Sequence, residues 1–175
     1  MGIRPAKCYR TPHRPYTRVS TRRPRKSYVK GVPKPKITGF EYGQKGNYSR
    51  TLYLLSDSHI QIRHNSLEAA RIAVVRELEK NVGKAGFFFK VRVFPHHVLR
   101  ENVMATGAGA DRFQTGMRQS FGKPIGTAAI VKIGQKIMEI RVNEAYVPKA
   151  KQAFRAAVHK LPIKGKIAIE EVSVL

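Results

Sequence analysis

The sequence predicts an α+β fold in which a mixed or antiparallel β-sheet forms a sandwich with two amphipathic helices. Three observations lead to this class. Two stretches carry apolar residues at helical spacing, about six shorter runs are rich in β-branched and aromatic residues, and strands and helices do not alternate regularly. Because a parallel, doubly wound sheet needs repeated βαβ units, their absence favours helices packed on one side of a sheet.

The strands are predicted from runs of apolar, β-branched and aromatic residues bounded by turn signals. Two of these runs flank Gly134 and Gln135, and we expect them to pair with each other as a hairpin. In the second, apolar and charged residues alternate, which is typical of a half-buried strand. The six predicted strands are residues 49–56, 60–63, 86–94, 127–133, 136–142 and 166–174.

The first predicted helix covers residues 65–82, where apolar side chains recur at steps of three and four. Asn65 is expected to cap its first free N–H groups with Glu68 three residues later, as in a capping box, and Gly83 to end it in a left-handed conformation. The second helix starts near Pro148, which suits a first helical turn. Its outer surface is basic, with Lys149, Lys151, Arg155 and Lys160.

The charge of the chain is large and unevenly spread. Its 175 residues contain 34 Lys and Arg against 11 Asp and Glu, a net charge of +23. Residues 1–40 hold 12 of these basic residues, six of the ten prolines and no acidic residue. We therefore divide the chain into an extended basic arm, residues 1–40, and an α+β domain, residues 41–175. So much positive charge indicates a polyanionic partner.

Four interpretations of the arm are open: a solvated tail, a transit peptide, a membrane-surface segment, or an arm ordered by phosphates. A transit peptide or a membrane segment would need an amphipathic helix, which the prolines oppose. Arginines bind phosphate in a bidentate manner, and tyrosines stack on unpaired bases. The predicted RNA contacts in the arm are Arg4, Lys7, Tyr9, Arg10, Arg14, Tyr16, Arg18, Arg22, Arg23, Arg25, Lys26, Tyr28 and Lys30.

Several protein classes are excluded by simple features. Cys8 is the single cysteine, so the chain cannot be an internally disulfide-bonded scaffold. No apolar run approaches the ~18 residues of a transmembrane helix, and the N-terminus has no apolar signal-peptide core. We expect no metal and no cofactor.

The most informative segment is a predicted loop, residues 101–126, which contains five glycines and no clear periodicity. Long loops in compact domains tend to be functional. A glycine-rich lid of an enzyme would look similar, but only Glu101 and Asp111 offer carboxylates here. The loop is instead surrounded by cations, which favours insertion into RNA: Arg100, Arg112, Arg118 and Lys123.

Other motifs are weak. The start of a dinucleotide fingerprint at residues 107–112 lacks its third glycine, and Pro124 breaks a phosphate-binding-loop pattern. His96 and His97 have only Glu101 close in sequence as a further metal ligand, so contact with RNA or solvent is the better interpretation. Residues 57–59 are Asp, Ser and His, the residue types of a catalytic triad. The side chains of adjacent residues point in different directions, so they cannot form a triad together. No catalytic constellation is found.

Arg63 and His64 directly precede the predicted helix at residues 65–82. The free N–H groups at a helix N-terminus attract phosphate. Simple capping by Asn65 explains the same residues, and the two interpretations are compatible.

The longer motifs resemble one family of ribosomal proteins, the archaeal and eukaryotic L10e branch of the universal L16p family. The resemblance covers essentially the whole chain and is carried by uncommon motifs. In the arm these are residues 4–10, 15–18 and 27–33. In the domain they are residues 61–71 (QIRHNSLEAAR), 91–102 (VRVFPHHVLREN), 107–112, 116–118 and 121–124.

This resemblance implies a structural constituent of the large ribosomal subunit in the cytoplasm, not an enzyme. It implies binding to large-subunit rRNA between the central protuberance and the peptidyl-transferase centre, with 5S rRNA, tRNA and other ribosomal proteins as neighbours. It further implies a loop over residues 101–118 that faces the catalytic centre and the A- and P-site tRNAs. The loop residues concerned are Asn102, Met104, Gly107, Gly109, Asp111, Arg112, Arg118 and Lys123.

Within the matched motifs, basic and histidine residues at strand and helix ends are predicted to contact rRNA: Arg63, His64, Arg71, Arg92, His96, His97 and Arg100. The arm is expected to fold only on binding, and the loop to be mobile in the free protein. A free-standing RNA chaperone or assembly factor would explain the charge equally well, but not the long family motifs.

Overall fold

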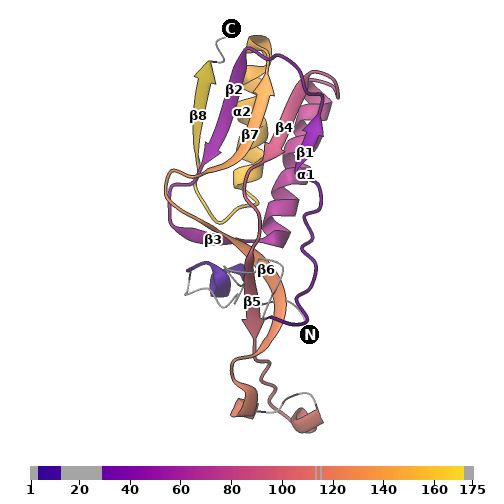
Figure 1. The fold of residues 1–175 in the computed structure, drawn as a ribbon, viewed down its shortest axis with the longest axis vertical. Helices are drawn as coiled ribbons and strands as arrows, with labels where there is room; N and C mark the ends of the chain where they lie inside the picture. Colours follow the sequence, from indigo (N-terminus) through magenta and orange to yellow (C-terminus); the bar gives the residue numbers. More distant parts are fainter. Residues whose placement is uncertain (1–3, 13–28, 113, 115, 172–175) are drawn as a thin grey trace, which may run out of the picture.

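The structure, a computed structural model, describes residues 4–12, 29–112, 114 and 116–171. These residues form two antiparallel sheets and two α-helices, which confirms the predicted α+β class. Figure 1 shows an elongated molecule in which the larger sheet and both helices form one end. The smaller sheet follows, and the loop between β5 and β6 forms the other end.

The larger sheet has the strand order β1-β4-β7-β2-β8, and every neighbouring pair is antiparallel. Both helices lie behind it in Figure 1 and contact each other. Leu52, Phe89, Ile140, Leu67 and Phe154 are fully buried between these layers, so this end contains the main core. The elements are β1 (Glu41–Gly43), β2 (Arg50–Leu55), β4 (Phe87–Val91), β7 (Lys136–Val142), β8 (Lys166–Glu171), α1 (His64–Asn81) and α2 (Val147–Val158).

The smaller sheet contains β3 (Ile60–Arg63), β6 (Lys123–Val131) and β5 (His97–Glu101), with β6 in the centre. Two of the eight strands, β1 and β5, were not predicted. Because β6 already starts at Lys123, the irregular segment is shorter than the predicted loop and spans residues 102–122. Four short 3₁₀ helices complete the described chain: η1 (Ala6–Tyr9), η2 (Ala110–Arg112), η3 (Gly116–Gln119) and η4 (Glu144–Tyr146).

The predicted hairpin around Gly134 is wrong. The strands before and after Gly134 lie in different sheets, because β6 pairs with β3 and β5 whereas β7 pairs with β2 and β4. The N–H of Gly134 donates to the carbonyl of Ser56 over 2.8 Å, and the N–H of Ser56 donates to the carbonyl of Gln135 over 3.0 Å. The chain thus forms one long antiparallel ribbon, β2-β3 against β6-β7, that bends between the sheets.

The helices match their predictions closely, except for the cap of α1. Helix α1 starts at His64, directly after the extended residue Arg63, and has no side-chain cap. Asn65 lies inside the first turn, so the predicted capping box is wrong. The left-handed end at Gly83 is confirmed by its φ of +84°, and Pro148 occupies the first turn of α2. Among the described residues, neither helix is both long and apolar enough to cross a bilayer.

Packed structure begins before residue 41. Val29 and Ile37 are 7% and 1% exposed, and Ile37 belongs to the main core. The carbonyl of Phe40 accepts a hydrogen bond of 2.8 Å from the N–H of Val91. The last part of the predicted arm is therefore integrated into the domain.

Candidate nucleic-acid interface

The N-terminal segment folds back onto the smaller sheet at the base of the loop. Its 3₁₀ turn η1 packs beside β3, and the N–H of Gln61 donates to the carbonyl of Arg10 over 3.0 Å. The guanidinium of Arg63 donates to the carbonyl of Arg4 over 2.9 Å and lies 5.7 Å from the centre of the Tyr9 ring. Residues 4–10 therefore have a defined shape on the protein surface.

Glu101, the last residue of β5, joins this segment to the loop. One carboxylate oxygen lies 2.7 Å from Arg4 Nε, and the other accepts a hydrogen bond of 3.2 Å from the Tyr9 hydroxyl. Burial and the neighbouring carboxylate raise the pKa of Tyr9, so its hydroxyl is a neutral donor. Two basic segments far apart in the sequence, the arm and the loop, thus converge at one end of the molecule.

The loop after Glu101 has internal contacts near its base. Arg100 Nη1 donates to the carbonyl of Gly122 over 3.0 Å, and the Arg100 guanidinium lies 4.5 Å from the centre of the Phe121 ring. The side chain of Asn102 donates to the carbonyl of Gly116 over 3.2 Å. Large apolar side chains remain exposed on the loop and on the strand that follows: Met104, Met117, Phe121 and Ile125.

Carboxylates are concentrated at the opposite end, where they pair with basic side chains. Glu139 is fully buried and bridges Arg92 and Arg141, each at 2.6 Å. Arg50 contacts both Glu144 and Glu171. The other ion pairs of the larger sheet and its flanking segments are Glu41 with Lys45 and Lys90 and Glu170 with Lys136, and Glu68 pairs with Arg71 near the start of α1.

The end of the molecule formed by the arm, the smaller sheet and the loop is called the loop end. Several of its cations lack such carboxylate partners. Within the described part of the chain, no carboxylate pairs with Lys7, Arg10 and Lys30 of the arm, or with Arg112, Arg118 and Lys123 of the loop and β6. All six are exposed. The outer surface of α2 is also basic and exposed, as predicted, and Tyr146 directly before it is 37% exposed. Unneutralised cations next to exposed apolar and aromatic side chains suit a nucleic-acid strand.

The N-terminus of α1 lies close to this end, and it starts with a neutral histidine. Burial, together with the positive charges of Lys36 and Arg63, lowers the pKa of His64. Its Nδ1 accepts a hydrogen bond of 2.9 Å from the backbone N–H of Lys36. A Cβ at Gly126 would lie 3.1 Å from His64 Nε2, so the ring packs directly on β6. The ring fixes the start of α1 against the smaller sheet.

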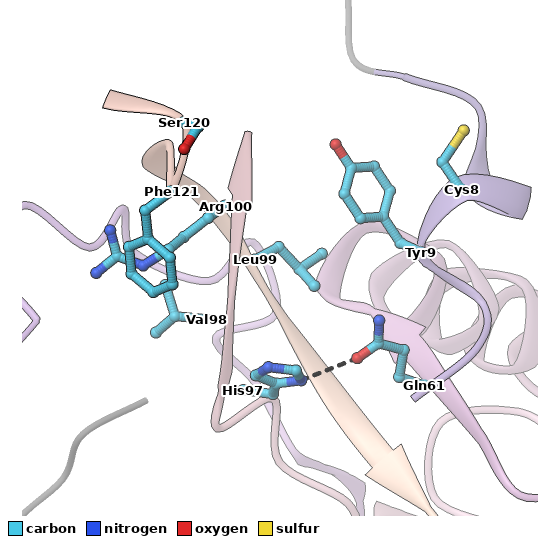
Figure 2. A pocket seen from close by; sticks show the side chains of 9 residues that line it. All are labelled: Cys8, Tyr9, Gln61, His97, Val98, Leu99, Arg100, Ser120 and Phe121. Carbon is cyan, nitrogen blue, oxygen red and sulfur yellow. Dashed lines mark hydrogen bonds between the residues drawn. The ribbon is translucent and has the colours of Figure 1, made fainter. Parts of the chain in front are cut away.

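Between η1, β5 and the loop lies a pocket of about 320 Å³. Figure 2 shows Tyr9 and Phe121 on opposite sides of Leu99, with His97 and Gln61 below. His97 Nδ1 lies 2.9 Å from the side-chain oxygen of Gln61. The remaining residues that line the pocket are Cys8, Val98, Arg100 and Ser120.

Comparison with known proteins identifies the family. The sequence model described as "Ribosomal protein L16p/L10e" matches residues 16–168. The chain belongs to the L16p/L10e family of ribosomal proteins. Relatives named large ribosomal subunit protein uL16 are 49% identical over 172 residues in Staphylothermus marinus and 47% identical over 177 residues in Hyperthermus butylicus. The aligned region covers 97% of this chain in both comparisons, and 95% and 94% of the two relatives. The predicted archaeal and eukaryotic branch is thus confirmed.

The structure brings some of the predicted site residues of this ribosomal protein together. Five of them line the pocket or belong to or contact residues 4–10, the docked arm segment beside it: Arg4, Tyr9, Arg63, His97 and Arg100. Lys7, Arg10 and Lys30 are exposed on the arm. Eight predicted residues lie outside the described part of the chain: Arg14, Tyr16, Arg18, Arg22, Arg23, Arg25, Lys26 and Tyr28.

Other predicted residues lie elsewhere or are already engaged. Arg92 is paired with Glu139 on the larger sheet. Arg71 is paired with Glu68, and its guanidinium lies 4.6 Å from the Tyr42 ring centre. His96 is exposed and its ring is tilted by 47° against that of Phe94, with 4.6 Å between the ring centres, whereas its neighbour His97 is 5% exposed. The roles of these residues in RNA binding stay predictions.

Sequence reasoning missed three residues of this site in the L16p/L10e chain. Gln61 lies in a predicted strand and was assigned no role. Phe121 was used only as part of a family motif, and Glu101 only as an unpartnered carboxylate of the loop. Glu101 was a detectable candidate, because it is the first acidic residue after a long basic stretch that ends at Arg100 and directly precedes the glycine-rich loop.

Proposed function

We propose that this ribosomal protein is a constituent of the large subunit and binds large-subunit rRNA through the end of the molecule formed by the arm, the smaller sheet and the loop. One observation carries the proposal: Glu101 holds Arg4 and Tyr9 at the base of the loop, so the two basic segments converge. Counterion release from RNA supplies much of the affinity of such a surface.

The loop supports a second part of the proposal, contact with tRNA near the peptidyl-transferase centre. In Figure 1 the loop extends from β5 and β6, away from the larger sheet. Met117 is 70% exposed in the loop, and Arg112 and Arg118 of the same loop are also exposed. Such a projection can reach a neighbouring RNA while the domain stays anchored on rRNA. We expect 5S rRNA and other ribosomal proteins to be neighbours, in cytoplasmic ribosomes.

Sedimentation tests the first part. Purified protein is added to large subunits depleted of it, and the particles are pelleted through a cushion at moderate salt. A subunit constituent rebinds at one copy per particle and stays bound. A free RNA chaperone would dissociate or bind in variable amounts, and that result would contradict the proposal.

A loop variant tests the second part. Replacement of residues 104–119 by two glycines leaves the docked arm segment, Glu101 and the smaller sheet in place. We expect this variant still to rebind the particles, with a weaker salt dependence because Arg112 and Arg118 are removed, but to reduce the affinity of those particles for A- and P-site tRNA. Unchanged tRNA affinity would remove the proposed role of the loop without affecting the proposed rRNA binding.

A further inference from the structure

The pocket beside Leu99 has the size and lining of a small-ligand site. Its volume of about 320 Å³ lies at the lower end of ligand pockets, which span roughly 300–1,000 Å³. Val98 and Leu99 supply apolar surface, while Gln61, His97 and Ser120 supply a few polar groups. This combination of apolar surface with a few fixed polar groups is typical of ligand sites.

Two aromatic rings indicate a flat ligand. Tyr9 comes from the arm and Phe121 from the end of the loop, and Figure 2 shows them on either side of Leu99. The Arg100 guanidinium lies over the Phe121 ring, 4.5 Å from its centre, and supports the ring from that face. Aromatic rings and stacked guanidinium groups bind the faces of unpaired bases.

The polar groups suit the edge of a base. The carboxamide oxygen of Gln61 is only an acceptor, so its contact with His97 Nδ1 at 2.9 Å requires the hydrogen on that nitrogen. This bond fixes the orientation of the amide. In Figure 2 the Gln61 nitrogen points away from His97, toward the side where Tyr9 lies. An amide donor held in this way can bond a ring nitrogen or carbonyl of a base.

The charge around the pocket selects a nucleotide over a neutral flat molecule. Lys7 and Arg10 are exposed in the segment that carries Tyr9, and neither pairs with a carboxylate in the described structure. Arg100 forms part of the wall. A base inserted between Tyr9 and Phe121 would leave its phosphates beside these cations.

We propose that this pocket binds one unpaired nucleobase of an RNA strand. The proposal deepens the proposed rRNA binding and rests on it. It also gives the docked arm segment a direct role, because η1 supplies one of the two aromatic walls.

The test uses the full chain and two short RNA probes at low salt: a trinucleotide with 2-aminopurine between two uridines, and the same trinucleotide with an abasic central position. Stacking quenches 2-aminopurine fluorescence. One stacked base contributes roughly 1–3 kcal/mol, so we expect wild type to prefer the base-containing probe by about tenfold. Equal affinity for both probes, with binding that still weakens as salt rises, would overturn the pocket proposal and leave the proposed rRNA binding standing.

Two variants locate the effect. Phe121→Leu removes an aromatic face from a side chain that is 58% exposed, and Ser120→Leu narrows the pocket from an exposed position. Both should lose most of the tenfold preference and the quenching, with unchanged affinity for the abasic probe. The matched control, Phe94→Leu, alters an exposed phenylalanine outside the pocket and should behave as wild type. An equal loss in the control would overturn the proposal, whereas absence of salt-dependent binding to either probe would contradict the proposed function itself.

Discussion

The Tyr9 hydroxyl donates a hydrogen bond of 3.2 Å to the carboxylate of Glu101, 92 residues later in the chain. The same carboxylate pairs with Arg4 at 2.7 Å. Glu101 ends β5 and begins the loop, so these contacts attach the arm to the element that positions the loop. The site therefore depends on a single acidic residue in a strongly basic region.

Replacement Glu101→Gln should release the arm. The ion pair with Arg4 disappears, and the amide is a weaker acceptor for Tyr9. Because Arg4 is half exposed, we expect only about 0.5 kcal/mol lower stability, but clearly faster hydrogen exchange in residues 6–10. The control Glu170→Gln breaks a more exposed ion pair, with Lys136 on the larger sheet, that has no contact with the arm. Unchanged exchange in the arm of Glu101→Gln would show that η1 is held by other contacts.

Gly122 should tolerate no side chain. Its φ is +80°, and a Cβ there would lie 2.5 Å from the backbone carbon of Glu101. The control Gly109 has nearly the same φ, +78°, but open space around it. Alanine at a left-handed position costs about 1 kcal/mol. Gly109→Ala should show only this cost, and Gly122→Ala about 2 kcal/mol more, measured by denaturant unfolding. Equal losses would mean that the loop base adjusts freely.

Sequence reasoning found the elements whose signals are local. Helix α1 was predicted within one residue at each end, because its apolar positions and Gly83 are visible in the sequence. The strands that pair with β6 and β7 were not predicted correctly. Gly134 gives the same turn signal whether the flanking strands pair with each other or with β3 and β2. Strand β5 was missed because it adjoins the glycine-rich segment and its partner, the start of β6, was assigned to the loop.

The candidate site was predictable only in part. Basic residues of the arm and loop were recognised from their charge alone. That Tyr9 lies beside Glu101, or that Gln61 contacts His97, depends on tertiary contacts between segments that no sequence spacing connects. The predicted cap at Asn65 failed for a related reason: β3 runs directly into α1, so the helix begins one residue earlier.

The buried carboxylate of Glu139 should stabilise the larger sheet. Burial raises its pKa, but hydrogen bonds from Arg92 and Arg141 outweigh this effect, so the pKa is lowered overall. Because both arginines are partly exposed, we expect Glu139→Gln to cost about 1–2 kcal/mol. Thermal unfolding should show a melting temperature lower by a few degrees. Glu171→Gln, at an exposed pair with Arg50, should change it much less.

The pH dependence of Glu139 has a defined sign. A carboxyl group with a lowered pKa in the folded state stabilises the protein above its unfolded-state pKa, and this stabilisation is lost as the pH falls through the folded-state value. Glu139→Gln should therefore differ most from wild type at neutral pH. The difference should shrink as the pH falls below the ordinary carboxyl pKa. A constant difference between pH 7 and pH 3 would argue against the lowered pKa.

The lowered pKa of His64 predicts a second, separate effect of pH on stability. Its pKa is lowered by burial and by Lys36 and Arg63, so the unfolded chain binds the proton more readily. Stability from this group is present above the unfolded histidine pKa of about 6.5 and is lost as the pH falls below it. His64→Asn keeps an acceptor for the Lys36 N–H and removes the titration. Between pH 7 and pH 5 this variant should lose less stability than wild type, and an identical slope would refute the assignment.

The salt dependence of rRNA binding tests the central claim most directly. One variant, R112Q/R118Q/K123Q, neutralises three cations of the loop end, and the other, R76Q/K80Q/K84Q, neutralises three exposed cations on α1 and just after it. Each phosphate contact contributes about 0.7–0.9 to the slope of log Kobs against log salt. On large-subunit rRNA we expect the first variant to reduce that slope by about 2 and the second to leave it unchanged. Equal reductions, or a larger one in the α1 variant, would contradict binding through the loop end.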